Sequence, residues 1–336
     1  MFARFGFLLA FALLFMPHAQ AASFDCSKAK TTFAKAICTD PDLSKSDDAL
    51  AKAFADAQVG LSKPAAAAVQ AGQGEWQAYV TLACTDDNKP RKRPYDADGL
   101  SCLRSEFDNR AAALANSKAI GNYRFYSVDH FSTALDTDAQ ADSSYSKVGK
   151  MSLSVPRIDG GDAVATAFNA LMEKTETALA GQKDENGPGS EDIDNLLSVS
   201  AANPQRITVS ETDSSYGHGA AHGNYGVTYL HFLTGPKRLL AASDVFTGDA
   251  WQKKLQDLAL AQLKQDQGED LMLDDPTAIA PLVIDPARWD FSADGLILQF
   301  QPYEVAAYAV GAVTATVPWS KLEGDLVPGA KAALGL

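Results

Sequence analysis

The chain has 336 residues, of which 42 are acidic and 29 basic, so its formal net charge is −13. This acidity argues against nucleic acid as a partner, because phosphate binding requires clustered Lys and Arg. The length exceeds the roughly 100–200 residues of a typical domain, so we expect two globular domains.

The first 21 residues have the features of a secretory signal peptide. Arg4 precedes the apolar run FGFLLAFALLFM, and Ala19 and Ala21 form the A-x-A pattern at which such signals are cleaved. The run is about a dozen residues long, whereas a membrane-spanning helix needs roughly 20. We therefore expect a periplasmic or secreted chain without a membrane span. Cleavage of the signal peptide would remove Arg4 and leave 28 basic and 42 acidic residues, a net charge of −14.

The four cysteines, Cys26, Cys38, Cys84 and Cys102, all lie near the start of the chain. In an oxidising compartment an even number of cysteines in one short region predicts two disulfides. A continuous helix from Cys26 to Cys38 would hold the two sulfurs roughly 18 Å apart. Either the chain turns after Cys26 or these two residues bond elsewhere, and all three connectivities stay open. The absence of a CxxC pair argues against a zinc site.

Residues 22–118 are expected to form a small antiparallel helical domain. The apolar periodicity predicts four helices, at residues 27–38, 42–61, 75–84 and 102–115. Asp40 and Pro41 suit the start of the second helix, and Gly60 and Pro64 limit its end. A bundle of this size buries little apolar surface, so disulfides are expected to stabilise it.

Residues 119–336 differ in composition from residues 22–118, because they contain no cysteine and include strand-like segments. Aromatic and β-branched content predicts strands at 122–131, 147–156, 206–212, 224–233 and 313–319, and a hairpin at Asp294-Gly295. Helical periodicity predicts helices at 161–181 and 249–265, and residues 182–192 read as a loop. The fold class is therefore α+β, with a mixed or antiparallel sheet and helices packed on it.

The stretch SSYGHGAAHGNYG, residues 214–226, places His218 and His222 four residues apart among four glycines. This spacing suits two zinc ligands on a helix, but the glycines interrupt any helix and no Glu follows His218. A phosphate-binding loop would need a following Lys-Ser/Thr, which is absent. We interpret the stretch as a glycine-shaped connection between two strands, and we predict neither a metal nor a cofactor.

Exposed loops of this kind also carry recognition residues. The later segment PYEVAAYAVGA adds a Tyr-Glu pair among small apolar residues, in which a buried carboxylate is conceivable. The candidate partner contacts are Tyr216, His218, His222, Asn224, Tyr303 and Glu304.

Catalytic motifs are missing: there is no G-x-S-x-G elbow, and the cysteines read as paired rather than nucleophilic. We therefore predict a protein that is not an enzyme. The alternatives are a metal-dependent cell-wall glycan hydrolase or deacetylase that uses the histidine loop, and an envelope protein that binds glycan or another protein.

Residues 24–114 resemble the LprI-type lysozyme inhibitor family. The resemblance rests on FDCSKAKTTFAKAIC, DPDL, Trp76, Cys84 and CLRSEFDNRAAAL. It implies a small exported helical domain with this layout of four cysteines.

Residues 120–330 resemble the extracellular RsiV-like domain of lysozyme-sensing anti-sigma factors. The motifs are Gly219–Gly223, Thr234-Gly235 and Pro302–Glu304, with VPWSKL near the end of the chain. The resemblance implies a binding module without known catalysis. Together the two resemblances imply a periplasmic lysozyme-binding or lysozyme-inhibiting protein, whose acidic surface would attract a basic c-type lysozyme.

Overall fold

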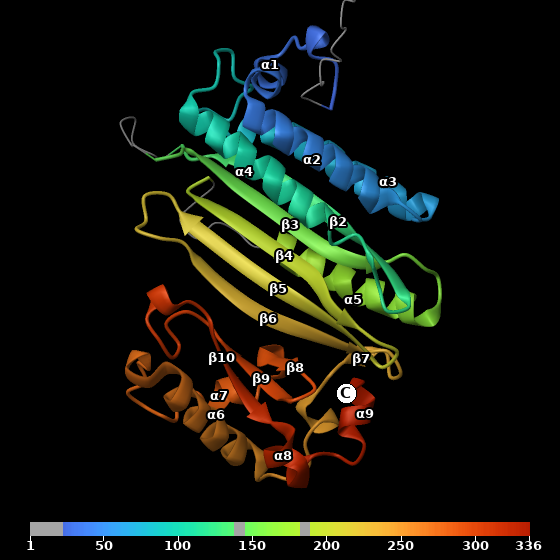
Figure 1. Cartoon of the computed structure of the whole chain (residues 1–336), viewed down its shortest axis with the longest axis vertical. Helices are drawn as coiled ribbons and strands as arrows, with labels where there is room; N and C mark the ends of the chain where they lie inside the picture. Colours follow the sequence, from blue (N-terminus) through green and yellow to red (C-terminus); the bar gives the residue numbers. More distant parts are fainter. Residues whose placement is uncertain (1–22, 138–144, 182–188) are drawn as a thin grey trace, which may run out of the picture.

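The computed structural model describes residues 23–137, 145–181 and 189–336. The expected signal peptide, residues 1–21, lies outside these ranges. A helical bundle covers one end of a large sheet, and a second, smaller sheet with its own helices lies at the other end (Figure 1). This arrangement is an α+β fold, as expected from the sequence. No helix in the described part of the chain is long and apolar enough to cross a membrane.

The N-terminal bundle has four helices, and two disulfides connect its ends. The helices are α1 (Thr32–Thr39), α2 (Pro41–Gln58), α3 (Lys63–Ala83) and α4 (Ala97–Leu114). Cys26 pairs with Cys38 and Cys84 with Cys102, which leaves no free cysteine. The first pairing is possible because the chain turns after Cys26: a short 3-10 helix (Cys26–Lys28) precedes α1.

The starts of three helices differ from the expectation, while the start of α2 is confirmed. The helix α1 begins at Thr32 instead of residue 27, and α4 begins at Ala97 instead of residue 102. Asp40 caps α2 through a 2.7 Å bond from the Leu43 amide, with Pro41 in the first turn. The third helix was expected at residues 75–84, but α3 already begins at Lys63, because Pro64 starts this helix and the Ala-rich segment that follows favours helix.

The main sheet contains seven strands among the described residues, in the order of the chain. They are β1 (Ala119–Ile120), β2 (Tyr123–Leu135), β3 (Val148–Ile158), β4 (Glu191–Ala202), β5 (Arg206–Gly217), β6 (Asn224–Leu233) and β7 (Arg238–Leu239). All neighbours are antiparallel except β3 and β4, which are parallel and joined through α5 (Ala163–Ala180). The sheet is therefore mixed. The β4 strand was missed in the sequence, where its first two residues were assigned to a loop.

The two faces of the main sheet are covered differently. Side chains of paired residues lie on the same face, so the register defines each face. On one face, α5 buries Phe168 and Met172 against Phe125, Leu197 and Phe232. On the other face, the bundle covers β2 and β3, and the C-terminal region covers β6. The strip between these two coverings, along β4 and β5, stays open.

The C-terminal region has its own hydrophobic core around a three-stranded sheet. Its elements are α6 (Trp251–Gln267), α7 (Ala280–Val283), β8 (Trp289–Phe291), β9 (Gly295–Phe300), β10 (Val313–Pro318), α8 (Trp319–Leu322) and α9 (Ala330–Leu334). The core is rich in Trp and Phe, with Trp251, Trp289 and Phe300 buried. The side chain of Gln301 donates to the carbonyl of Val227 and accepts from its amide, which satisfies the outer edge of β6.

A buried ion pair joins the bundle to the main sheet. Arg110 of α4 donates to Asp129 of β2 at 2.6 Å, and both side chains are at most 1% exposed. Gln73 of α3 accepts from Arg110 Nε at 3.0 Å, and Ser154 of β3 donates to the other Asp129 oxygen at 2.5 Å. Gly72 allows α3 to approach β2, because a Cβ atom there would lie 3.2 Å from that of Asp129.

Candidate functional site

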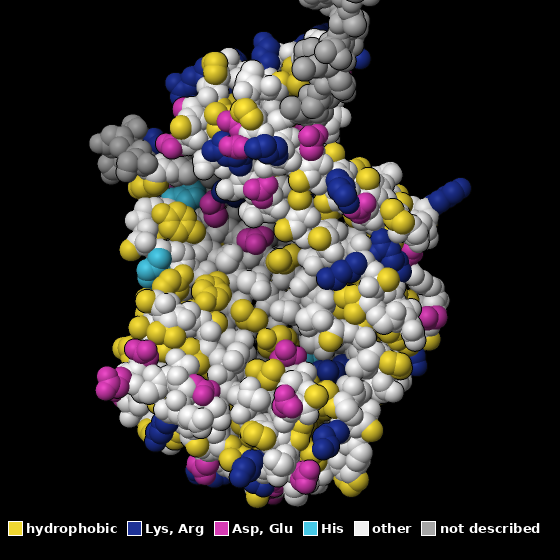
Figure 2. Space-filling model, viewed as in Figure 1, with side chains coloured by type: hydrophobic (Ala, Val, Ile, Leu, Met, Phe, Trp, Pro, Cys, Tyr) yellow, Lys and Arg dark blue, Asp and Glu magenta, His cyan; other side chains and the backbone are white. Residues whose placement is uncertain are grey.

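The open strip of the main sheet is the floor of a groove of about 700 Å³. One wall is α4, with Glu106 and Asn109, and the opposite wall carries Tyr225 and Tyr308. In Figure 2, yellow ring side chains and cyan histidines gather at the left edge of the molecule, where the connection between β5 and β6 lies. The groove is thus bounded by the bundle on one side and by the C-terminal region on the other.

A row of small polar side chains crosses the floor of this groove. Ser152 of β3 is paired with Asp194 of β4, which is paired with Ser214 of β5. The Ser152 hydroxyl donates to the Asp194 carboxylate. Although Asp194 is exposed to the groove, the surrounding walls desolvate its carboxyl and raise its pKa above the usual value. Asp194 thus lies at the centre of the floor, between Ser152 and Ser214, with its carboxyl group open to the groove.

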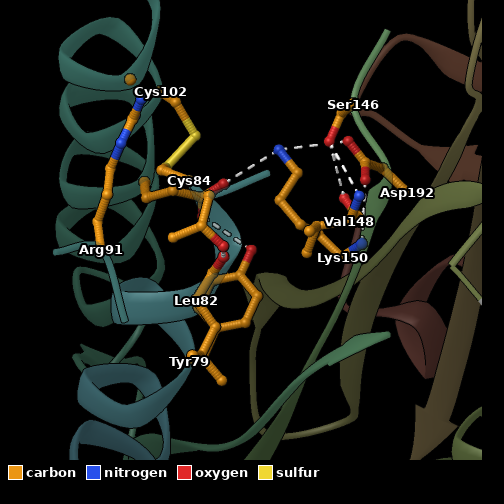
Figure 3. The surroundings of a disulfide bond; sticks show 12 residues. Tyr79, Leu82, Cys84, Arg91, Cys102, Ser146, Val148, Lys150 and Asp192 are labelled. Carbon is orange, nitrogen blue, oxygen red and sulfur yellow. Dashed lines mark hydrogen bonds and ion pairs between the residues drawn. A yellow bond between two sulfur atoms is a disulfide. The ribbon is translucent and has the colours of Figure 1, made fainter. Parts of the chain in front are cut away.

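A chain of charged and polar side chains runs from the bundle to the loop after β5. Tyr79 donates to Glu106 at 3.0 Å, and Lys150 lies 3.2 Å from both Glu106 and Asp192. His218, with a side chain only 2% exposed, lies 3.1 Å from Asp192. Figure 3 shows Lys150 between the Cys84–Cys102 disulfide and Asp192. We call Tyr79, Glu106, Lys150, Asp192 and His218 the polar network.

The two carboxylates of the polar network, Glu106 and Asp192, favour the charged form of Lys150. Burial alone would lower the pKa of Lys150, but Glu106 and Asp192 more than offset this effect and raise the pKa above its usual value. Lys150 is therefore protonated and already paired. Burial, followed by the nearby Glu106 carboxylate, raises the pKa of Tyr79, which keeps its hydroxyl neutral as a donor.

A second cavity, of about 720 Å³, continues the groove past the Cys84–Cys102 disulfide. Lys150, Asp192 and Tyr216 line both cavities, so the two cavities meet at these residues. The Tyr216 side chain is 38% exposed. Its hydroxyl donates to the Ala220 carbonyl at 3.3 Å, which holds the ring at this junction.

An aromatic cluster stands at the mouth of the groove. The His222 ring stacks on Tyr308 at 4.0 Å between centroids, and His222 Nε2 lies 3.2 Å from the Tyr303 hydroxyl. Tyr225 meets Tyr308 edge-on and accepts a bond from the Ala312 amide at 2.9 Å. We call His222, Tyr225, Tyr303 and Tyr308 the aromatic rim.

The backbone holds Tyr303 in an unusual conformation. Its φ is +70°, which is uncommon for any residue but glycine and costs of order 1–3 kcal/mol. The next residue, Glu304, fixes this turn: its carboxylate accepts from the Gln301 amide at 2.6 Å and pairs with Arg288 at 2.8 and 2.9 Å. The Tyr303 side chain is consequently held outward and is 61% exposed.

The six candidate contacts from the sequence fall into three groups in the structure. Tyr216 and Asn224 line the groove, and His222 and Tyr303 belong to the aromatic rim. His218 and Glu304 have internal partners instead: His218 lies against Asp192, and Glu304 forms an ion pair with Arg288. The interpretation of residues 214–226 as a connection between strands agrees with the structure, since β5 ends at Gly217 and β6 begins at Asn224.

The sequence analysis did not identify several residues of the groove, namely Asp194, Ser152 and Lys150. The alternation in EDIDNLLSVS, which places Asp192, Asp194 and Ser198 on one face and Leu197 and Val199 on the other, was the available signal. His218 and His222 have different partners, and the described ranges contain no cluster of three or more His, Cys, Asp and Glu side chains suited to a metal ion.

Comparison with known proteins identifies two regions of this chain. Residues 25–114 match the family model of the lysozyme inhibitor LprI, which confirms the first resemblance. Residues 243–320 match the family model of the protein of unknown function DUF3298. The RsiV-like label given to residues 120–330 is not confirmed, because the matching model is DUF3298. No curated protein matches the sequence.

Two solved DUF3298 structures are similar to part of the chain. A member of the family from Bacteroides fragilis NCTC 9343 is 18% identical with a TM-score of 0.47, over 65% of this chain and 99% of that chain. A DUF3298 family protein from Pseudomonas aeruginosa PAO1 is 12% identical with a TM-score of 0.43, over 64% of this chain and 98% of that chain. From the family models, the chain carries a lysozyme inhibitor LprI domain at residues 25–114 followed by a DUF3298 domain at residues 243–320.

Proposed function

We propose that this chain is a periplasmic or secreted protein that binds lysozyme and inhibits it, and that it is not itself an enzyme. The observation that carries the proposal is the match of residues 25–114 to the lysozyme inhibitor LprI family. We propose residues 22–118 as the inhibitor domain and residues 119–336 as a second binding domain. The signal-like residues 1–21 support export.

The charge of the chain supports a basic partner such as a c-type lysozyme. Acidic residues outnumber basic ones by 42 to 29. Opposite net charges accelerate the encounter of two proteins and lose this effect when salt screens them. We therefore expect association with lysozyme to be faster at low ionic strength.

The mouth of the groove is the docking surface that we favour. Tyr303 is exposed there, and tyrosine is enriched among residues that dominate binding energy. The strained backbone of Tyr303 supports the same surface, because strain of this kind concentrates at functional sites. In this arrangement Glu304 positions Tyr303 and does not itself contact the enzyme.

A muramidase assay with a c-type lysozyme tests the proposal. We expect the purified chain to inhibit cell-wall lysis at about 0.05 M salt and less at about 0.5 M, where the Debye length shortens. Tyr303→Ala should weaken inhibition by about tenfold, as expected for a central tyrosine. Met272→Ala is the matched control, since Met272 is 63% exposed and lies outside the groove.

Two results would contradict the proposal. Absence of both inhibition and complex formation at either salt concentration would exclude lysozyme as the partner. Equal effects of Tyr303→Ala and Met272→Ala would exclude the mouth of the groove as the docking surface and leave the surface of the helical bundle to be tested by the same assay.

A further inference from the structure

The floor of the groove offers side chains, not backbone, to a ligand. The three strands that form it, β3, β4 and β5, are interior strands with partners on both sides. Their backbone groups are used in the ladders, so an extended peptide cannot add to the sheet there. A ligand in the groove is therefore recognised by side chains alone.

Those side chains are mostly hydroxyls and amides, which both donate and accept hydrogen bonds. They come from α4 and the residues just after it on one wall, from β3, β4 and β5 on the floor, and from the start of β6 on the opposite side. The neutral polar residues that line the groove include Asn109, Asn116, Ser152, Ser198, Ser214 and Asn224. Such a lining suits a ligand that carries many hydroxyl groups and suits an apolar helix poorly.

The charges in the groove disfavour an anionic ligand. Two cationic side chains line it, and both are already paired: Arg110 with Asp129, and Lys150 with Glu106 and Asp192. The remaining charged group on the floor is the Asp194 carboxylate, whose described hydrogen bond comes from Ser152. A phosphate or nucleotide would meet this carboxylate without a matching cation, whereas adjacent hydroxyls of a neutral sugar can donate to it.

Aromatic rings complete the lining. Tyr216 stands where the two cavities meet, and Tyr225 and Tyr308 lie on the wall opposite α4. Tyrosine presents an apolar ring face with a polar tip, which suits a pyranose whose C–H face is apolar and whose rim carries hydroxyls. A cavity of about 700 Å³, continued by the second, lies in the range of small-molecule sites.

From these observations we propose that the groove is a binding site for a neutral oligosaccharide. The sugar rings stack on Tyr216, and their hydroxyls bond to Asp194 and Ser214 on the floor. This activity goes beyond lysozyme binding, because its residues lie on the floor of the groove while the proposed enzyme contact centres on Tyr303 at its mouth.

Isothermal titration calorimetry of the full chain with chitotetraose and maltotetraose tests the proposal. We expect saturable binding of at least one of these neutral tetrasaccharides. Tyr216→Ala should weaken it by about tenfold, as for loss of a central aromatic contact. Ser214→Leu should abolish binding by filling the floor without changing the charge. Circular dichroism and thermal melting of each variant check that it is folded.

Two control variants make the outcome specific. Tyr303→Ala should keep the sugar affinity while it loses lysozyme inhibition, so the two proposals fail separately. Met272→Ala should change neither. No saturable binding of either tetrasaccharide, or binding that survives both Tyr216→Ala and Ser214→Leu in folded protein, would overturn the proposal. Preferential binding of inorganic phosphate in the groove would also overturn it.

Discussion

Removing one partner of the buried Arg110–Asp129 pair should destabilise the chain strongly. The guanidinium and the carboxylate are 2.6 Å apart and excluded from solvent. Arg110→Ala would leave the Asp129 carboxylate buried with only the Ser154 hydroxyl as a described polar partner, and would leave Gln73 without its donor. An uncompensated buried charge of this kind costs about 3–5 kcal/mol.

Urea denaturation followed by tryptophan fluorescence and by circular dichroism measures this cost. The urea dependence is about 1–3 kcal/mol per molar for small proteins and increases with size, so with a slope of about 3 kcal/mol per molar the midpoint should fall by roughly 1–2 M. Because the pair joins α4 to β2, we expect the bundle and the sheet to lose stability together. Both probes should therefore shift.

The double variant Arg110→Leu with Asp129→Leu makes the reasoning falsifiable. Replacing both charges by apolar groups removes the unpaired charge, so most of the lost stability should return. A loss below about 1 kcal/mol for Arg110→Ala would show that water reaches Asp129 and would refute the buried-charge argument. A double variant less stable than Arg110→Ala would show that shape, not charge, decides the cost.

Three further predictions follow from single contacts. Gly72→Ala should destabilise the fold, because the new Cβ would lie 3.2 Å from the Cβ of Asp129, which its partners hold in place. Gly74→Ala is the control, because a Cβ there would meet nothing within 4 Å, and the free energy of unfolding measured in urea should rise by up to about 1 kcal/mol. Replacing Cys84 and Cys102 by Ser should cost about 3 kcal/mol, the entropy of a loop near this length, and should lower the melting temperature. His231 donates from Nε2 to the Trp289 carbonyl, and burial, followed by nearby Arg206, lowers its pKa to about 3. Since the unfolded histidine gains its proton near pH 6.5, stability should fall as pH decreases from there towards about 3, by roughly 2 kcal/mol at pH 5, and His231→Gln should reduce this slope in pH-dependent melting. A His231→Gln slope equal to that of the native chain would contradict this assignment.

Helix caps and the alternation of apolar residues were sufficient to predict most helices and strands. The cap at Asp40 and Pro41 located the start of α2, and the aromatic alternation at 224–233 gave the limits of β6. Short-range sequence failed at β4, where acidic residues alternate with apolar ones. Carboxylates at such positions are rare in strands, and they are stable here because β3 supplies their partners: Lys150 pairs with Asp192, and Ser152 donates to Asp194.

The candidate site was predictable only in part, for the same reason. The glycine-rich stretch drew attention to His222 and the segment PYEVAAYAVGA to Tyr303, and the structure places the two side chains in contact. The same stretch suggested His218 as a surface contact, whereas its side chain is buried beside Asp192. Whether a polar residue points to solvent or into an ion pair depends on elements distant in sequence, so spacing alone could not decide it.

The sequence by itself determined the local and covalent features of this protein: an even set of four cysteines in its first third, helices before strands, an excess of acidic residues, and two segments that match family models. Tertiary structure alone decided which cysteines pair, and that Arg110 meets Asp129. It also decided that bundle and C-terminal region cover the same face of one sheet and leave a groove between them. The physical reason is that periodicity and caps are short-range properties, whereas a groove is the space left when distant elements bury their apolar faces.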